Sequence, residues 1–231
     1  MQPYLFPYLG YFNLIKSCDK FVFLDDVNFM KKGWVNRNYI ILNDKPYRFS
    51  VPLNKSSQNA KINKLSINKS SNYFRKFKST LYYSYNKSPY YESLIEKIGP
   101  ILFDESLSIS ELAIKSIKTM CSIMGINKKF YKSSTISNEI REYKGARRLV
   151  EITKYLGGNE YINLPGGKDL YSKSFFNIHG IDLKFINPLL PEYDQFNNNG
   201  EFINKLSIID ILMNINPKEY RKIISAYNLE E

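Results

Sequence analysis

The stretch DKFVFLDDV, residues 19–27, is a short apolar run that ends in two adjacent carboxylates, Asp25 and Asp26. Phenylalanine, valine and leucine between charged boundaries predict a buried β-strand that reaches the surface at its acidic end. Open α/β sheets place their functional groups at the carboxyl ends of strands. Neighbouring side chains on a strand point to opposite faces, so we expect only one of the two aspartates to face a cleft.

The rest of the chain predicts an alternation of strands and helices. A two-strand hairpin is expected around Asn43–Pro46, because turn-forming residues separate two β-prone runs. Apolar residues from Leu112 to Met124 recur at three- and four-residue spacing, with Gly125 as a stop signal. Ser207 and Asp210 fit the S-x-x-[DE] pattern of a helix capping box. Further expected elements are a helix in residues 144–158, strands in 160–164 and 181–186, and a helix from Asn216 with Pro217 at its first position.

This order predicts an α/β or α+β protein. We expect residues 1–231 to form a single domain with a mixed sheet, flanking helices and a helical insertion or subdomain at about residues 70–130.

Composition narrows the class of protein further. The chain has 231 residues, of which 43% are hydrophobic and 15% aromatic, as expected of a folded globular protein. Its formal net charge of +11 comes from lysines scattered along the sequence, which favours a composition bias over a nucleic-acid face. Two cysteines and one histidine do not form a disulfide framework or a zinc motif. No signal peptide or 18-residue apolar run is evident, so we expect a cytoplasmic protein without a membrane span.

The opening segment, QPYLFPYLGYF (residues 2–12), predicts an ordered loop. Pro3 and Pro7 cannot donate backbone hydrogen bonds and disfavour helix interiors. The aromatic rings can pack into the core, while Gln2 and one tyrosine hydroxyl can instead face a pocket. The residues alone leave these two roles open.

The segment DDVNFMKKGWVNRN (residues 25–38) concentrates polar chemistry around the only tryptophan. Arg37 supplies a planar cation for a carboxylate or phosphate, and Asn36 and Asn38 supply amide donors. Trp34 offers a flat face for a sugar or base. The alternative is a loop with an internal Asp–Arg pair and a buried tryptophan.

Three further regions carry weaker signals. Ser133 and Ser134 can bind phosphate or cap a helix. The glycine pair of NLPGGKDLY (residues 163–171) permits close backbone approach to a ligand but is more typical of a turn. His179 precedes a glycine and can be a base or a turn residue.

Together these stretches resemble the WbqC-like family. The resemblance rests on QPYLFPYLGYF (2–12), DKFVFLDDV (19–27) and KKGWVNRN (31–38), and it continues through VPL (51–53), SS (133–134), YINLPGGKDLY (161–171), GIDLKF (180–185), EYDQF (192–196) and LSIIDILMN (206–214). Relatives usually carry a few residues that form a strand before the Gln-Pro pair. Met1 is therefore expected either to be internal to a longer product or to follow a shortened strand.

The resemblance implies an enzyme of bacterial O-antigen or other surface-polysaccharide biosynthesis. The implied activity is an N-acyltransferase that moves an acyl or aminoacyl group, such as glycyl, to the amino group of a nucleotide-linked amino-dideoxy sugar. The implied co-substrate is a thioester on a carrier protein or coenzyme A, with no tightly bound cofactor and no metal. N-acylation needs a base and oxyanion donors. The implied catalytic residues are Asp25, Asp26 and His179, and the implied substrate-binding residues are Gln2, Tyr4, Tyr11, Lys32, Trp34, Asn36, Arg37, Asn38, Ser133, Ser134, Arg147, Tyr171, Tyr193 and Gln195.

Three alternatives stay open. A nucleotidylyltransferase-like enzyme would also want aspartates at a strand end with basic residues nearby. A non-catalytic module that binds a sugar nucleotide or carrier protein would show an exposed Trp34 and both aspartates held in structural pairs. A nucleic-acid-binding protein would gather its lysines on one face. For the transferase, we expect Gln2, one of Asp25 and Asp26, Trp34 and Arg37 to line one pocket, with rings of the opening segment packed beneath it.

Overall fold

The computed structural model describes residues 1–57, 59–102, 108–196 and 200–230, and it confirms the predicted mixed α and β class, with small sheets in place of the one expected mixed sheet. In this part of the chain, the strands fall into three sheets. β1 (Lys20–Phe23) pairs in parallel with β4 (Lys129–Lys132), and β2 (Arg37–Leu42) forms an antiparallel hairpin with β3 (Lys45–Ser50). The third sheet is mixed, with β5 (Glu160–Asn163) parallel and β7 (Tyr227–Glu230) antiparallel to the central β6 (Asp182–Pro188).

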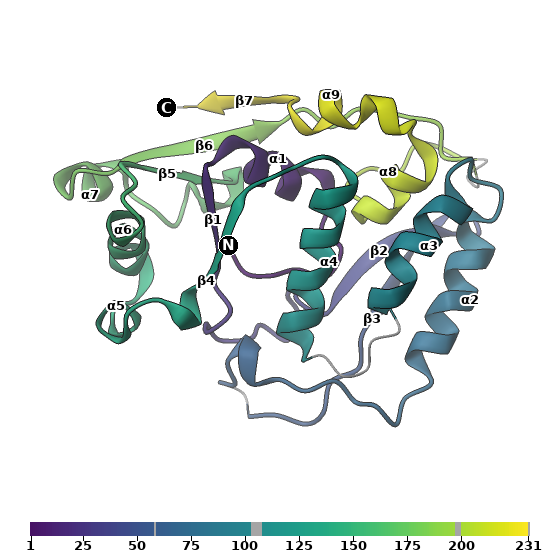
Figure 1. Ribbon diagram of the computed structural model, residues 1–231, viewed down its shortest axis with the longest axis horizontal. Helices are drawn as coiled ribbons and strands as arrows, with labels where there is room; N and C mark the ends of the chain where they lie inside the picture. Colours follow the sequence, from purple (N-terminus) through teal and green to yellow (C-terminus); the bar gives the residue numbers. More distant parts are fainter. Residues whose placement is uncertain (58, 103–107, 197–199, 231) are drawn as a thin grey trace.

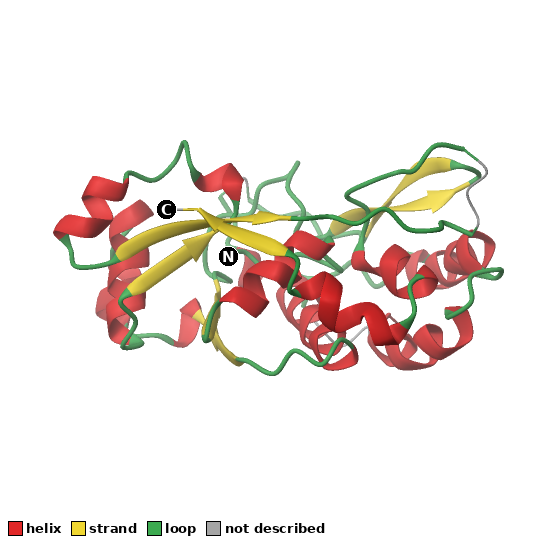
Figure 2. Cartoon of the chain, turned by 90° about the horizontal axis from the view of Figure 1, so that it is seen from above, coloured by secondary structure: helices red, strands yellow, loops and turns green. Residues whose placement is uncertain are grey.

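The hairpin forms as its turn chemistry predicts. Asn43 and Asp44 are its two loop residues, and both have positive φ angles, 53° and 57°. A two-residue loop with positive φ at both positions matches the right-handed twist of the flanking strands, and asparagine and aspartate tolerate this conformation well. The hairpin and the β5–β6–β7 sheet lie toward opposite ends of an elongated molecule (Figure 2).

The helices surround these sheets in two groups. Figure 1 shows α2 and α3 beside the hairpin, α5, α6 and α7 beside the mixed sheet, and α4 near the middle. The described helices are α1 (Leu9–Ser17), α2 (Tyr73–Tyr85), α3 (Tyr91–Leu102), α4 (Ile109–Ile123), α5 (Asn138–Glu142), α6 (Gly145–Tyr155), α7 (Lys173–Ile178), α8 (Ile208–Asn214) and α9 (Tyr220–Ile224).

The residues of the predicted helical insertion share a core with the rest of the chain. α2, α3 and α4 occupy the described part of residues 70–130. Their buried side chains, such as Leu81, Ile98 and Ile117, belong to one cluster with Phe12 of α1 and Leu212 of α8. These three helices therefore complete the main core.

The opening segment is a loop only as far as Tyr8. The expected loop is wrong for residues 9–12, because Pro3 and Pro7 both lie before α1 and do not interrupt it. Three side chains fix the loop by hydrogen bonds to the backbone of Phe6. The Phe6 N–H donates to Ser116 Oγ of α4 at 3.1 Å, and its carbonyl accepts from Asn38 Nδ2 at 2.6 Å and Ser207 Oγ at 2.8 Å. Phe6 has a φ of 44°, a left-handed conformation that costs a non-glycine residue on the order of 1–2 kcal/mol. Its buried ring and these three hydrogen bonds hold that conformation in place.

The predicted capping box of α8 forms only in part. Ser207 Oγ accepts from the Ile209 N–H at 3.3 Å, so the serine does cap the helix. The backbone N–H of Ser207 already donates to the carbonyl of Tyr39, which removes the donor that Asp210 would need.

The Asp210 carboxylate instead forms a buried network. It accepts from the hydroxyls of Tyr85 at 2.8 Å and Tyr193 at 2.6 Å, and from Gln195 Nε2 at 3.2 Å. Burial raises the pKa of Asp210, and these hydrogen bonds oppose that rise. The carboxylate therefore joins α2 and the 193–195 segment to α8.

None of the described helices has the length and apolar character needed to cross a bilayer.

Replacement of Ser116 by alanine tests the hydrogen bond that holds the backbone of Phe6. The Ser116→Ala variant leaves the buried Phe6 N–H without its acceptor, so we expect the free energy of unfolding to fall by about 1–3 kcal/mol in urea titrations. Ser79→Ala, at an exposed position of α2, makes the same chemical change and should stay within about 0.5 kcal/mol of wild type. Equal losses for the two variants would contradict this role.

Candidate functional site at the ends of β1 and β4

The candidate site lies where the parallel strands β1 and β4 end. Asp25 and Asp26 follow β1, and Ser133 and Ser134 follow β4 as the start of a 3₁₀ turn, Ser133–Thr135. β1 and β4 lie side by side (Figure 1), and because the carboxyl ends of parallel strands meet at one edge, the four residues that follow them come together. The predicted strand is confirmed as β1, but the expectation that its acidic end reaches the surface is wrong, because protein donors meet both aspartates and leave them buried, at 3% and 7% exposure.

Asp25 is held by the serine that follows β4. Its Oδ1 accepts from the Ser134 N–H at 3.0 Å, and its Oδ2 accepts from Ser134 Oγ at 2.6 Å. Ser133 Oγ lies 3.4 Å from Oδ1 as a weaker donor. Both oxygens of this carboxylate therefore already have protein donors.

Asp26 is paired with an arginine from α6. Arg148 Nη2 donates to both carboxylate oxygens, at 2.8 and 2.7 Å, and Ser133 Oγ donates to Oδ1 at 2.5 Å. Only 9% of Arg148 is exposed, so this is a buried ion pair. Burial raises the pKa of Asp26, but the hydrogen bonds from Ser133 and Arg148, together with the arginine charge, outweigh it and bring the pKa below its usual value.

Arg148 is one of the site residues that the sequence analysis did not name, since Arg147 was named instead. Arg147 lies on the outer face of α6, where it forms an ion pair with Glu151 at 2.8 Å and is 41% exposed. The available signal was helical spacing: Arg148 is four residues before the buried Ile152 and so shares its face.

A cleft opens beside this cluster, and we call it the strand-end cleft. One wall is the 3₁₀ turn Ile62–Lys64, tied to the site by a hydrogen bond from Asn63 N–H to the Asp25 carbonyl at 2.8 Å. The opposite wall is α5, from which Arg141 Nη1 donates to the Ser134 carbonyl at 3.1 Å. The cleft measures about 610 Å³ and is lined by Asp26, Lys61, Asn63, Lys64, Ser134, Asn138, Arg141 and Glu142.

The cleft is rich in cations. Three cations, Lys61, Lys64 and Arg141, line the cleft together with two carboxylates, Asp26 and Glu142, and Asp26 is also paired with Arg148. The arrangement can bind a phosphate or diphosphate, because arginine and lysine donate several hydrogen bonds to such anions. In the described part of the chain, no three histidine, cysteine or acidic side chains are grouped so as to hold a metal ion.

The segment of Lys32 and Trp34 lies away from this cleft. Residues 27–29 pair with residues 60–62, through Ile62 N–H to the Val27 carbonyl and Phe29 N–H to the Ala60 carbonyl, which leads the chain out toward the hairpin. There Trp34 is 45% exposed and packs edge-on against Tyr39, with ring centroids 5.9 Å apart.

The amides near Trp34 have structural partners. Asn36 Nδ2 donates to the Val51 carbonyl at 2.8 Å, and Asn38 Nδ2 donates to the Phe6 carbonyl at 2.6 Å. Arg37 begins β2 opposite Ser50 and is half-buried. The cleft lining includes Asp26 but not Gln2, Trp34 or Arg37, so the structure does not bring the four expected residues together there.

The opening segment pairs with β1 near the carboxyl end of that strand. The Met1 amino group donates to the Val22 carbonyl at 2.9 Å, and Leu24 N–H donates to the Met1 carbonyl at 2.8 Å. This pattern is that of a parallel pair, so the chain runs from Met1 in the direction of Asp25. The Tyr11 hydroxyl donates to the Gln2 carbonyl at 2.8 Å, and the Tyr4 ring packs 5.7 Å from Tyr11. The fully buried Tyr11 is therefore a core residue.

The remaining predicted residues have roles elsewhere in the fold. His179 caps the end of α7, with its Nδ1 2.7 Å from the Phe175 carbonyl. Tyr171 packs on Phe176, while Tyr193 and Gln195 hold the Asp210 carboxylate. None of these four side chains lines the strand-end cleft.

Known proteins resemble this chain over almost its whole length. A family model described as "WbqC-like protein family" matches residues 2–222. The uncharacterized protein Rv1507c of Mycobacterium tuberculosis is 24% identical over 220 residues, which is 93% of this chain and 92% of that protein. No solved structure matches the chain.

Loss of the buried arginine should be costly. The Arg148→Met variant leaves the Asp26 carboxylate buried without its counter-charge, and we expect the free energy of unfolding to fall by about 3–5 kcal/mol. Arg147→Met removes a more exposed pair and should cost no more than about 1 kcal/mol. Chemical denaturation of both variants measures the difference, and similar costs would contradict the pairing.

The loss of unfolding free energy in the Arg148→Met variant should depend on pH in a defined direction. Because the pKa of Asp26 is lowered in the folded protein, its stabilising contribution is present above the unfolded pKa of about 3.9 and is lost as pH falls through the folded pKa. Without Arg148, burial favours the protonated acid, so acid should harm the variant less than wild type. The gap in unfolding free energy should therefore narrow between pH 7 and pH 3, and a constant gap would exclude this explanation.

Proposed function

The chain belongs to the WbqC-like protein family, and we propose that it binds a nucleotide-linked amino sugar in the strand-end cleft and transfers an acyl or aminoacyl group to the sugar's amino group. One observation carries the proposal: the cleft combines three cations with an ionised carboxylate at the ends of parallel strands. A sugar nucleotide with a free amine presents the complementary pattern, an anionic diphosphate beside a cationic ammonium.

The cations bind the diphosphate in this account. Lys61 and Lys64 approach from the 62–64 turn, and Arg141 approaches from α5. Arg141 uses Nη1 on the Ser134 carbonyl, which orients its guanidinium toward this part of the cleft wall. A guanidinium carries five N–H donors, so one bond to a carbonyl leaves others for phosphate oxygens.

Asp26 orients the amine. Its lowered pKa makes it a weak proton acceptor and a stable anion, so it holds the sugar ammonium without removing the proton. In the transfer, the ammonium first gives up one proton to solvent, and the neutral amine attacks the thioester carbonyl. A C–N bond forms, the C–S bond breaks, the nitrogen loses a second proton, and the departing thiolate takes up one proton. We assign the developing oxyanion to Asn138, whose amide lines the cleft, because the amides of Asn36 and Asn38 are already committed to backbone carbonyls.

The co-substrate of this reaction is an acyl or aminoacyl thioester on a carrier protein or coenzyme A. Nucleotide-linked sugars and such thioesters are formed in the cytoplasm, and we place the activity there, in surface-polysaccharide biosynthesis.

A second candidate function is a non-catalytic module that binds the same sugar nucleotide. It is favoured by the observation that Asp25 and Asp26 already have protein donors and that Trp34 is exposed. The two candidates share the cleft and differ in whether turnover follows binding.

Steady-state kinetics tests the transferase. Acyl transfer from acyl-coenzyme A and from an acyl carrier protein is measured with nucleotide-linked 4-amino- and 3-amino-dideoxy sugars. Lys64→Gln and Arg141→Gln should each raise KM for the sugar nucleotide about tenfold with a small change in kcat, since they remove ground-state phosphate binding. Lys222→Gln, on the exposed face of α9, removes the same charge outside the cleft and should leave KM unchanged.

Calorimetric titration of the sugar nucleotide separates the candidates. Binding that depends on Lys64 and Arg141 but gives no product with any donor identifies the binding module. Binding that is indifferent to both residues excludes the strand-end cleft as the site.

A further inference from the structure

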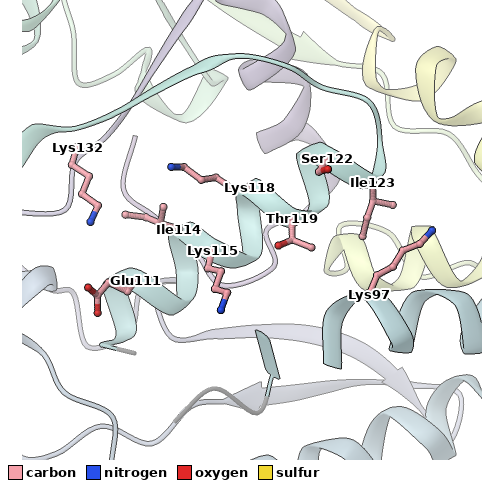
Figure 3. A pocket seen from close by; sticks show the side chains of 9 residues that line it. All are labelled: Lys97, Glu111, Ile114, Lys115, Lys118, Thr119, Ser122, Ile123 and Lys132. Atoms are coloured by element: carbon pink, nitrogen blue, oxygen red, sulfur yellow. The ribbon is translucent and has the colours of Figure 1, made fainter. Parts of the chain in front are cut away.

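A second charged surface lies along α4, outside the strand-end cleft. One face of this helix is lined by residues spaced three and four apart from Glu111 to Ile123, which spans about 18 Å at the rise of an α-helix. Lys97 of α3 and Lys132 of β4 flank it, as Figure 3 shows. The resulting groove, which we call the basic groove, measures about 820 Å³ and is lined by Lys97, Glu111, Ile114, Lys115, Lys118, Thr119, Ser122, Ile123 and Lys132.

The charge of the basic groove is strongly positive. Four of the nine lining residues are lysines and one is acidic. The acid, Glu111, accepts hydrogen bonds from the Ser108 N–H at 3.0 Å and the Ser108 hydroxyl at 2.8 Å as part of the helix cap. These hydrogen bonds lower the pKa of Glu111 and keep it ionised, so the lining side chains carry four positive charges against one negative charge, which lies at the start of α4.

The floor of the groove is apolar. Ile114 and Ile123 lie along it, with the small side chains of Thr119 and Ser122 between them. An elongated apolar floor with a basic rim matches an amphipathic helix that has an apolar stripe and acidic flanks. The lining has no aromatic ring on which a base could stack, which disfavours a single-stranded nucleic acid.

The basic groove and the candidate site share no lining residue, but both adjoin the carboxyl end of β4. Lys132, at one end of the groove, directly precedes Ser133, whose hydroxyl donates to Asp26. A protein docked along α4 is therefore adjacent to the edge at which the strand-end cleft opens.

We propose that the basic groove docks an acidic helix of the carrier protein that delivers the thioester donor. This inference rests on the proposed transferase function and names the partner that supplies its second substrate. Charge complementarity attracts the acidic helix to the lysines, and contacts with the apolar floor fix the position of that helix along the groove.

Charge reversal in the groove tests this docking. Lys97→Glu combined with Lys118→Glu changes the groove from both α3 and α4. Titration with a purified apo acyl carrier protein should show affinity at least about tenfold weaker than for wild type, and wild-type binding should weaken steeply with salt. The matched control, Lys173→Glu combined with Lys218→Glu, makes the same change in net charge at exposed positions outside the groove and should bind within about twofold of wild type.

Comparison of two donors separates this inference from the proposed function. The groove variant should raise KM for an acyl carrier protein donor while transfer from acyl-coenzyme A stays unchanged. No transfer from either donor in wild type would reject the transferase while leaving the titration to decide the docking. Unchanged carrier binding, an equal loss in the control, or tighter lysine-dependent binding of a 20-nucleotide RNA would each overturn the docking proposal.

Discussion

The burial of two adjacent carboxylates is the constraint on which the rest of this structure depends. Asp25 and Asp26 lie at the end of β1, away from water, and a buried carboxylate is tolerated only where donors or a counter-charge meet it. The donors come from Ser133, Ser134 and Arg148, each more than 100 residues further along the chain. Because the two carboxylates need these donors, β4 and α6 pack at the end of β1. The strand-end cleft opens at the edge that they form.

Much of the fold was predictable because its signals are local. β1 and the Asn43–Asp44 hairpin follow from apolar runs and turn residues, and α4 follows from helical periodicity and its stop at Gly125. The left-handed Phe6 was not predictable, since its conformation is held by Asn38, Ser116 and Ser207 from three other elements. Asp210 likewise looked like a cap in sequence but is drawn into a tyrosine network that only the tertiary fold creates.

The candidate site was predictable in part for the same reason. Asp26, next to a predicted strand end, and Ser134, named as a phosphate-binding or capping residue, do line the cleft, although β4 before Ser134 was not predicted. Lys61 and Lys64 lie in a polar, lysine-rich segment that reads as a surface loop, and nothing local distinguishes them from other lysines. Trp34 stood out as the only tryptophan, yet the pairing of residues 27–29 with 60–62 leads it away from Asp26. The rarity or chemical character of a residue is therefore a weaker guide to the site than its position relative to a strand end.

The central claim is that an anionic amino-sugar nucleotide occupies the strand-end cleft, and hydrogen–deuterium exchange tests it most directly. Amide exchange is measured with and without a nucleotide-linked 4-amino-dideoxy sugar. The account predicts slower exchange in residues 61–64 and 134–142, which form the two walls of the cleft. Protection confined to residues 31–38 around Trp34, with no change in those two segments, would contradict it.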